Sequence, residues 1–131
     1  LYASNVSGNN VISCNLNSLD GSLSNCNPFI NAGLSSPRGM SIRNNYMYVA
    51  NTGNSTISMC NLSVNPISCV NANAALINEP AGLSIFNNYL FYNNTKGAIP
   101  VISCSFNSDN SLNCVDAQAT GVSTANNFLI W

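Results

Sequence analysis

The sequence predicts an all-β protein, and three observations lead to this class. Short runs alternate polar and apolar residues with a period of two, as in Thr56-Ile57-Ser58-Met59-Cys60. Turn-forming residues separate these runs, and no apolar spacing typical of a helix continues over the ten or so positions that a helix needs. The chain also repeats itself at an interval of about 45 residues, which is typical of architectures made of stacked units.

Four short strands are expected within one period, and turn residues lie between them. The pair Asn44-Asn45 stands between two apolar runs and is predicted to form a hairpin turn, because Asn tolerates a positive φ. The expected strands are Gly39–Arg43, Tyr46–Ala50, Thr56–Leu62 and Ile67–Val70.

Three copies of the repeat cover approximately residues 1–45, 46–88 and 89–127, and residues 128–131 start a further one. Between the first two copies the matched pairs are Tyr2 with Tyr48, Asn5 with Asn51, Cys14 with Cys60 and Leu16 with Leu62. The segment Pro37-Arg38-Gly39-Met40-Ser41-Ile42 recurs at 80–85 and, more weakly, at 119–124. An Asn-Asn pair and an aromatic residue follow each of these segments, at 44–46, 87–89 and 126–128.

Four antiparallel strands in each repeat predict the blade of a β-propeller. We therefore expect a single domain over residues 1–131 with about three four-stranded antiparallel blades. Three blades are fewer than the four of the smallest propellers. Residues 1–3 and 128–131 also align with the same strand. We therefore expect part of a larger ring of about six to eight blades, or an assembly in which the ends exchange strands.

One segment of the second repeat resembles a known family signature. Residues 48–58, with the sequence YVANTGNSTIS, are similar to the signature of YVTN-type propeller repeats and also to NHL repeats. The Pro-x-Gly-φ-Ser-φ segments, where φ is an apolar residue, resemble the strand that opens each blade in both families. This resemblance implies a propeller fold and an exported, surface-layer-like protein, and it implies no activity.

Six cysteines allow fifteen disulfide pairings, and the repeat selects one of them. Each copy carries two cysteines, on its third and fourth expected strands, and neighbouring antiparallel strands bring cysteines within disulfide range. Free thiols or a metal site are the alternative, but the chain has no His and no closely spaced Cys-x-x-Cys pair. The expected disulfides are Cys14–Cys26, Cys60–Cys69 and Cys104–Cys114.

Disulfides persist in oxidising compartments, so we expect a secreted, cell-surface or periplasmic protein. The chain has only three basic and four acidic residues. Three scattered cations cannot neutralise the phosphates that a nucleic-acid ligand presents, which argues against nucleic acid as a partner. The longest apolar stretches, such as Tyr46–Ala50, are far too short to cross a bilayer, so no membrane insertion is expected.

No residue set predicts catalysis, and no cofactor or metal ligand is assigned. Without His, a Ser or Cys nucleophile lacks its usual general base. The nearest pair of acids is Asp109 and Asp116, but Asp109-Asn110 is better interpreted as a hairpin turn. Asp20-Gly21 is also expected to be a turn, because a calcium loop needs several carboxylates at alternate positions. We therefore predict that the chain is not an enzyme.

Four Asn residues begin N-glycosylation motifs: Asn5, Asn54, Asn61 and Asn93. In so Asn-rich a chain some of these motifs arise by chance, and glycosylation remains a hypothesis. Aromatic residues recur at the second strand of each repeat, and we expect them to pack between blades rather than to form a sugar-stacking platform.

The sequence therefore predicts an extracellular structural or binding module that acts in adhesion, in a surface layer or filament, or in protein–protein interaction. The expected partners are a protein, a neutral glycan or further copies of the chain. A lectin-like propeller is the alternative function. An enzyme whose catalytic residues lie outside this stretch has less support.

Overall fold

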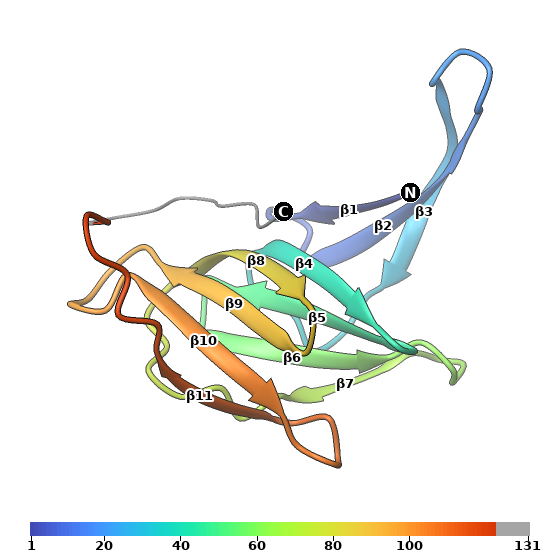
Figure 1. The fold of residues 1–131 in the computed structure, drawn as a ribbon. Coiled ribbons are helices and arrows are strands. Elements are labelled where there is room, and N and C mark those ends of the chain that lie inside the picture. The colour runs from blue at the N-terminus through green and yellow to red at the C-terminus, as the bar shows by residue number, and fades with distance from the viewer. Residues whose placement is uncertain (123–131) are drawn as a thin grey trace.

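The computed structural model describes residues 1–122, and in that part the chain forms eleven strands and no helix (Figure 1). The all-β prediction is confirmed. The strands form three antiparallel sheets that follow one another along the chain. The first sheet has the order β1-β2-β3, with bounds Tyr2–Asn5, Asn10–Leu16 and Leu23–Ile30.

The second and third sheets have four strands each. In the second sheet β4, β5, β6 and β7 span Pro37–Arg43, Tyr46–Asn51, Thr56–Asn61 and Ser68–Asn71. In the third sheet β8, β9, β10 and β11 span Pro80–Phe86, Tyr89–Asn94, Val101–Phe106 and Leu112–Asp116. The strands expected for the second sheet are therefore found, with ends that differ by one or two residues.

The first sheet differs from the prediction of four strands in each blade, because it has three. Residues 1–5 align with the second strand of the other sheets, so β1 is the counterpart of β5 and β9. The expected repeat boundaries at Tyr46 and Tyr89 coincide with the first residues of β5 and β9 and therefore lie inside sheets. The predicted Asn-Asn turn at 126–128 and the further repeat from 128 lie outside the described residues.

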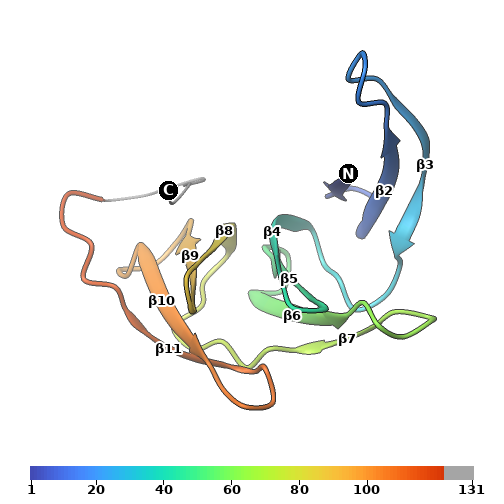
Figure 2. The ribbon, with the colours of Figure 1, turned by 45° about the vertical axis from the view of Figure 1, so that its right-hand side comes forward.

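Figure 2 shows the three sheets fanned in an open arc around a common centre. Strands β4 and β8 lie innermost, and β3, β7 and β11 lie outermost. The described residues do not form a closed ring. At the centre β4 and β8 approach so closely that a Cβ atom on Gly39 would lie 2.4 Å from the Ala81 carbonyl oxygen, so only glycine fits there.

Two apolar cores separate the sheets. Between the first and second sheets, the core contains Val11, Ile30, Met47, Val49 and Cys60. The core between the second and third sheets contains Tyr48, Ala50, Ile57, Ala72, Leu83, Leu90, Tyr92, Ile102, Cys104 and Leu112. Since successive strand residues point to opposite faces, Tyr48 packs on the third sheet and Val49 on the first. The second sheet is therefore buried on both faces.

The three disulfides, Cys14–Cys26, Cys60–Cys69 and Cys104–Cys114, join the cysteines that the repeat alignment pairs. Each bond ties the outermost strand of a sheet to its neighbour, with Cα atoms 4.0 to 4.1 Å apart. Three disulfides indicate an oxidising, extracellular compartment. Within residues 1–122 we find no helix long and apolar enough to span a membrane.

Two buried tyrosines fix the third sheet against the second. The Tyr48 hydroxyl donates to the Asn110 carbonyl oxygen at 2.8 Å, in the turn between β10 and β11. The Tyr92 hydroxyl donates to the Ala75 carbonyl oxygen, in the connection that precedes β8. Burial raises the pKa of Tyr48 to about 12, and it also raises the pKa of Tyr92. Both phenols are therefore neutral in the folded protein at physiological pH.

Removal of one disulfide should lower the stability measurably. For C60A/C69A we expect the free energy of unfolding to fall by about 2.5 to 3 kcal/mol, because the unfolded chain regains loop entropy. Urea unfolding followed by circular dichroism measures this change. The matched variant C14A/C26A opens a loop of similar length, 12 residues against 9, and should lose a similar amount. An unchanged unfolding midpoint in both variants would contradict a stabilising role.

Tyr48 should make the protein sensitive to alkali. Its pKa in the folded state lies above the unfolded value of about 10. Its stabilising effect is therefore complete below pH 10 and is lost as the pH rises towards 12. Tyr48→Phe should lower the free energy of unfolding by about 1 kcal/mol at pH 7, because the hydrogen bond to Asn110 is lost. The variant should also show a smaller decrease in stability between pH 10 and 12, because it has no phenol at position 48 to ionise. Urea titrations across that range measure both effects, and parallel pH profiles would disprove the assignment.

Candidate functional site

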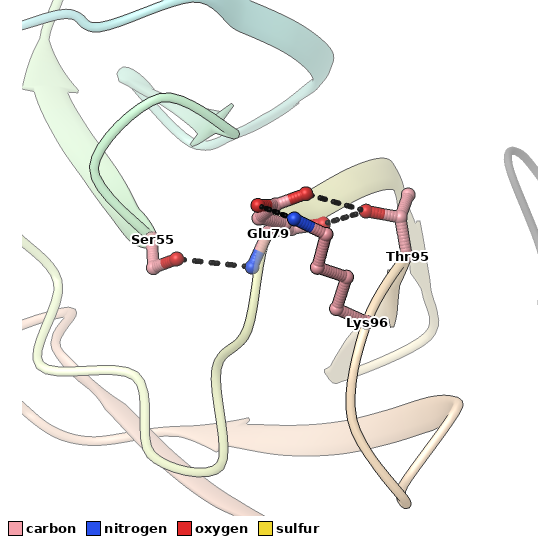
Figure 3. Close-up of polar contacts among 4 residues, drawn as sticks. All are labelled: Ser55, Glu79, Thr95 and Lys96. Atoms are coloured by element: carbon pink, nitrogen blue, oxygen red, sulfur yellow. Dashed lines mark hydrogen bonds and ion pairs between the residues drawn. The ribbon is translucent and has the colours of Figure 1, made fainter.

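Polar side chains gather where the second and third sheets meet (Figure 3). Ser55 lies in the turn between β5 and β6, and Glu79 directly precedes β8. Thr95 and Lys96 follow β9. This junction cluster, Ser55, Glu79, Thr95 and Lys96, brings together three connecting segments that are separate in the sequence.

Hydrogen bonds within the junction cluster hold the backbone at Glu79. The Ser55 hydroxyl accepts from the Glu79 amide at 3.0 Å, and the Thr95 hydroxyl donates to the Glu79 carbonyl oxygen at 2.9 Å. The Lys96 ammonium lies 2.7 Å from a Glu79 carboxylate oxygen. The Lys96 side chain is 66% exposed, so solvent screens this ion pair and it adds little stability. The cluster therefore positions the connection and offers no activated nucleophile.

The same bond recurs at the junction of the first and second sheets. There the Asn9 side-chain oxygen accepts from the Ser36 amide at 2.7 Å. Asn9 aligns with Ser55, and Ser36 aligns with Glu79. All four residues have a positive φ, between 46° and 52°. Each junction thus includes a bond in which the residue before the next sheet donates its backbone amide to a side chain of a hairpin turn.

The asparagine of the family-like signature has a structural role. Asn51 is fully buried, and its side-chain oxygen accepts from the Ser35 amide at 3.0 Å. Its amide group donates to the Ser58 hydroxyl at 2.8 Å. Asn94 holds the same position in the third sheet and accepts from the Asn78 amide at 2.8 Å. This asparagine therefore ties the connection that enters a sheet to the second strand of the same sheet.

Asn5 holds this position in the first sheet but has a different environment. It is partly exposed, and its side-chain oxygen accepts from the Gly8 amide at 3.1 Å, within the adjacent turn. In the described structure Asn5 therefore holds its own hairpin turn, whereas Asn51 and Asn94 hold the connection that enters their sheet.

At the end of the sheets away from the junction cluster, Arg43, the last residue of β4, joins the second sheet to the third. Its guanidinium carbon lies 4.2 Å from the centre of the Phe106 ring, and a guanidinium nitrogen donates to the Asn88 side-chain oxygen at 2.7 Å. Asn44 and Asn87, the first residues of the Asn-Asn pairs, have φ angles of 45° and 52°. The predicted turns are therefore confirmed at these two pairs.

The structure separates the four glycosylation motifs by accessibility. Asn54 is exposed in the turn between β5 and β6, whereas Asn5 and Asn61 are partly exposed. Asn93 is 0% exposed within β9 and accepts from the Gly82 amide at 2.7 Å, which leaves no space for a glycan. Asn54 is therefore the position most open to glycosylation, which remains a prediction.

The acidic residues do not converge on a catalytic pair. Asp20 and Asp109 lie in turns, where serine hydrogen bonds from Ser22 and Ser111 lower the pKa of each carboxyl. Asp116 ends β11 and accepts from the Gln118 amide at 2.7 Å. Within the described part of the chain, we find no group of three or more His, Cys, Asp or Glu side chains that could hold a metal ion.

The outer face of the third sheet exposes apolar side chains. Tyr89 and Phe91 lie on this face because their neighbours Leu90 and Tyr92 point into the core between the second and third sheets. Tyr89 is 50% exposed, and its ring centre lies 6.4 Å from that of Phe91. We call this surface the C-terminal face, and it consists of Phe86, Tyr89, Phe91 and Val115.

The first sheet also exposes apolar side chains on the side away from the second sheet. Ala3 and Ile12 are paired across β1 and β2, and they alternate with Val11, which points into the core. Leu16 lies on the same side of β2 as Ile12 and is exposed. We call this surface the N-terminal face, and it consists of Ala3, Ile12 and Leu16.

The aromatic residues of the second strands therefore divide into two groups. Tyr48 and Tyr92 are buried between sheets, as expected, whereas Tyr89 is exposed on the C-terminal face. Tyr46 packs partly buried against the core between the second and third sheets. Phe128 lies outside the described residues.

No known family model matches this chain, and no curated protein matches it. The similarity to YVTN-type and NHL repeats therefore depends on the motifs alone.

Replacement of the buried asparagine should destabilise the fold strongly. Asn51→Ala removes the acceptor for the Ser35 amide and two donated bonds, so we expect a loss of about 2 to 4 kcal/mol in unfolding free energy. Asn5→Ala is the matched control, because it removes a single exposed contact and should cost less than about 1 kcal/mol. Urea unfolding measures both, and equal losses would contradict the structural role of Asn51.

Proposed function

We propose that this chain is a non-enzymatic structural and binding module of a secreted, cell-surface or periplasmic protein. Its repeats are propeller blades of the YVTN or NHL kind, and it functions by packing against protein surfaces, including further copies of its own repeat. One observation carries this proposal. The C-terminal face exposes the positions that are covered between the second and third sheets.

The correspondence follows from strand register. Ser41 pairs with Tyr48 in the second sheet, and Ser84 pairs with Phe91 in the third, so Phe91 is the counterpart of Tyr48. By the same register Tyr89 is the counterpart of Tyr46. The third sheet covers the tyrosines of the second sheet. An equivalent partner surface would cover the aromatic pair of the C-terminal face.

The chemistry of the two end faces favours association through apolar contact. Neither the C-terminal face nor the N-terminal face includes a charged side chain. Aromatic residues are enriched and charges depleted at the cores of protein interfaces. With three basic and four acidic residues in the whole chain, electrostatic steering contributes little, and shape complementarity selects the partner.

A lectin function has less support from the geometry. A sugar site in every blade would need the same polar residue available in each repeat. The repeated asparagines Asn51 and Asn94 instead use their side chains to bind the backbone of their own sheets. They therefore have no exposed amide to offer a glycan.

The proposal predicts self-association through the C-terminal face. Analytical ultracentrifugation over a range of about 1 to 100 μM should give masses above the 13.8 kDa of a single chain. Tyr89→Glu places a charge on an exposed face residue and should shift the protein to 13.8 kDa. Leu19→Glu is the matched control, because Leu19 is exposed in the turn between β2 and β3, away from both faces.

A wild-type chain that stays at 13.8 kDa over the whole range would contradict self-association. A monomer that binds a neutral glycan on an array would instead support the lectin alternative.

A further inference from the structure

The guanidinium of Arg43 lies where the second and third sheets meet and is held there by two contacts. Its carbon atom lies 4.2 Å from the centre of the Phe106 ring, and one of its nitrogens donates to the Asn88 side-chain oxygen at 2.7 Å. Phe106 ends β10, and Asn88 lies in the turn between β8 and β9. All three residues therefore belong to the two four-stranded sheets.

This guanidinium has no carboxylate partner within residues 1–122. The ion pair found in that part of the chain joins Lys96 to Glu79, in the junction cluster at the other end of the sheets. A guanidinium carries several N–H donors and no acceptor, and the bond to Asn88 uses a single nitrogen. Arg43 is partly buried, so an anion beside it is attracted more strongly than in bulk water. Its remaining donors can therefore bind an acceptor from outside the chain.

The two contacts restrict the guanidinium before any ligand binds. A cation over an aromatic ring is attracted by the face of the ring, so Phe106 holds the group from one side. Asn88 fixes one of its nitrogens. The planar fork of N–H donors that remains matches the two oxygens of a carboxylate. A carboxylate that binds here therefore causes a smaller loss of side-chain entropy than one that binds a mobile Arg.

A hydrogen-bond acceptor lies close to this donor. Asp109 precedes Asn110, whose carbonyl oxygen accepts from the Tyr48 hydroxyl. Burial is the main cause that raises the pKa of Tyr48, and of the charges nearby Arg43 lowers this pKa whereas Asp109 raises it. Arg43 and Asp109 therefore lie near the same phenol, yet they form no ion pair in the described structure. The two bonds from Ser111 use one Asp109 oxygen, Oδ1, which leaves Oδ2 available.

We propose that Arg43 binds the carboxylate of a uronic acid, a sugar that carries one carboxylate and several hydroxyl groups. In this complex the Arg43 guanidinium and the amide group of Asn88 donate to the carboxylate, and Asp109 accepts from a sugar hydroxyl. One positive charge beside an acceptor suits a ligand with one negative charge and neutral donors. The inference goes beyond the proposed function, because it names a small ligand and needs no second copy of the chain.

Polyanions and acidic protein segments fit this site less well. Arg38 lies near the start of β4 and Lys96 lies in the junction cluster, so among the described residues Arg43 is the cation at this end of the sheets. Nucleic acids need several such cations. A protein carboxylate offers acceptors alone and would place a negative charge beside Asp109, whereas a sugar hydroxyl can donate to Asp109.

The site does not recur at the equivalent positions of the neighbouring sheet. Phe86 of the third sheet aligns with Arg43, and Leu62 of the second sheet aligns with Phe106. The site also makes no use of the buried asparagines Asn51 and Asn94. It therefore differs from a lectin that has one sugar site in every blade.

Titrations followed by ¹⁵N NMR test the ligand. Galacturonate should shift the side-chain resonances of Arg43 and Asn88 with a dissociation constant of about 1 mM. Galactose lacks the carboxylate, and acetate lacks the hydroxyl groups. A blocked aspartate, N-acetylaspartic acid amide, carries the carboxylate of a protein. Each of these three probes should bind at least about tenfold more weakly than galacturonate.

Three substitutions test the residues. Arg43→Gln should weaken galacturonate binding by about tenfold or more. Arg38→Gln is the matched control, because Arg38 is exposed near the start of the same strand, and it should bind as the wild type does. Asn88→Asp, in an exposed turn, should also prevent binding, because its carboxylate pairs with Arg43 and occupies the site. Urea unfolding checks that each variant is folded.

Several results would overturn the proposal: no binding of galacturonate at about 50 mM, equal affinity for galactose, or unchanged binding by Arg43→Gln. If the blocked aspartate binds at least as tightly as galacturonate, the ligand is a protein carboxylate and the sugar assignment is wrong. Self-association is measured separately by ultracentrifugation, without any sugar. Failure of the sugar site and failure of the proposed self-association are therefore distinguishable.

Discussion

The packing of sheet on sheet is the interaction on which the rest of this structure depends. The inner strands carry apolar residues on both faces, so a sheet of this kind must be covered on both sides. In the second sheet Tyr48 packs towards the third sheet and Val49 towards the first. Within residues 1–122, the first and third sheets each have one neighbouring sheet, and each keeps one apolar face exposed. The same constraint that stabilises the chain therefore leaves two exposed apolar surfaces, the N-terminal face and the C-terminal face.

Because the chain has few charged residues, neutral hydrogen bonds rather than ion pairs hold most of the connections between its sheets. With seven charged side chains in the chain, the loops are held mainly by neutral hydrogen bonds that backbone amides donate to Asn and Ser side chains. The Ser36 amide donates to Asn9 and the Glu79 amide donates to Ser55, so the entry into successive sheets is fixed in the same way. The disulfides act at the other edge, where the outermost strand of a sheet would otherwise fray. The result is a disulfide-bonded scaffold whose surface carries few charges.

The sequence by itself determined the strands of the second sheet, the Asn-Asn turns at 44–45 and 87–88 and the cysteine pairs, because these depend on local alternation and on equivalence between repeats. Only the tertiary structure decided which side chains are accessible and which sheets are complete. Asn51 and Asn93 look like surface residues in the sequence but are fully buried, because the entering connection and the neighbouring strand supply their hydrogen bonds. The contact of Arg43 with Phe106 and the exposure of Tyr89 likewise depend on which sheet lies next to which. Neither local spacing nor composition encodes that arrangement, because it forms between residues far apart in the chain.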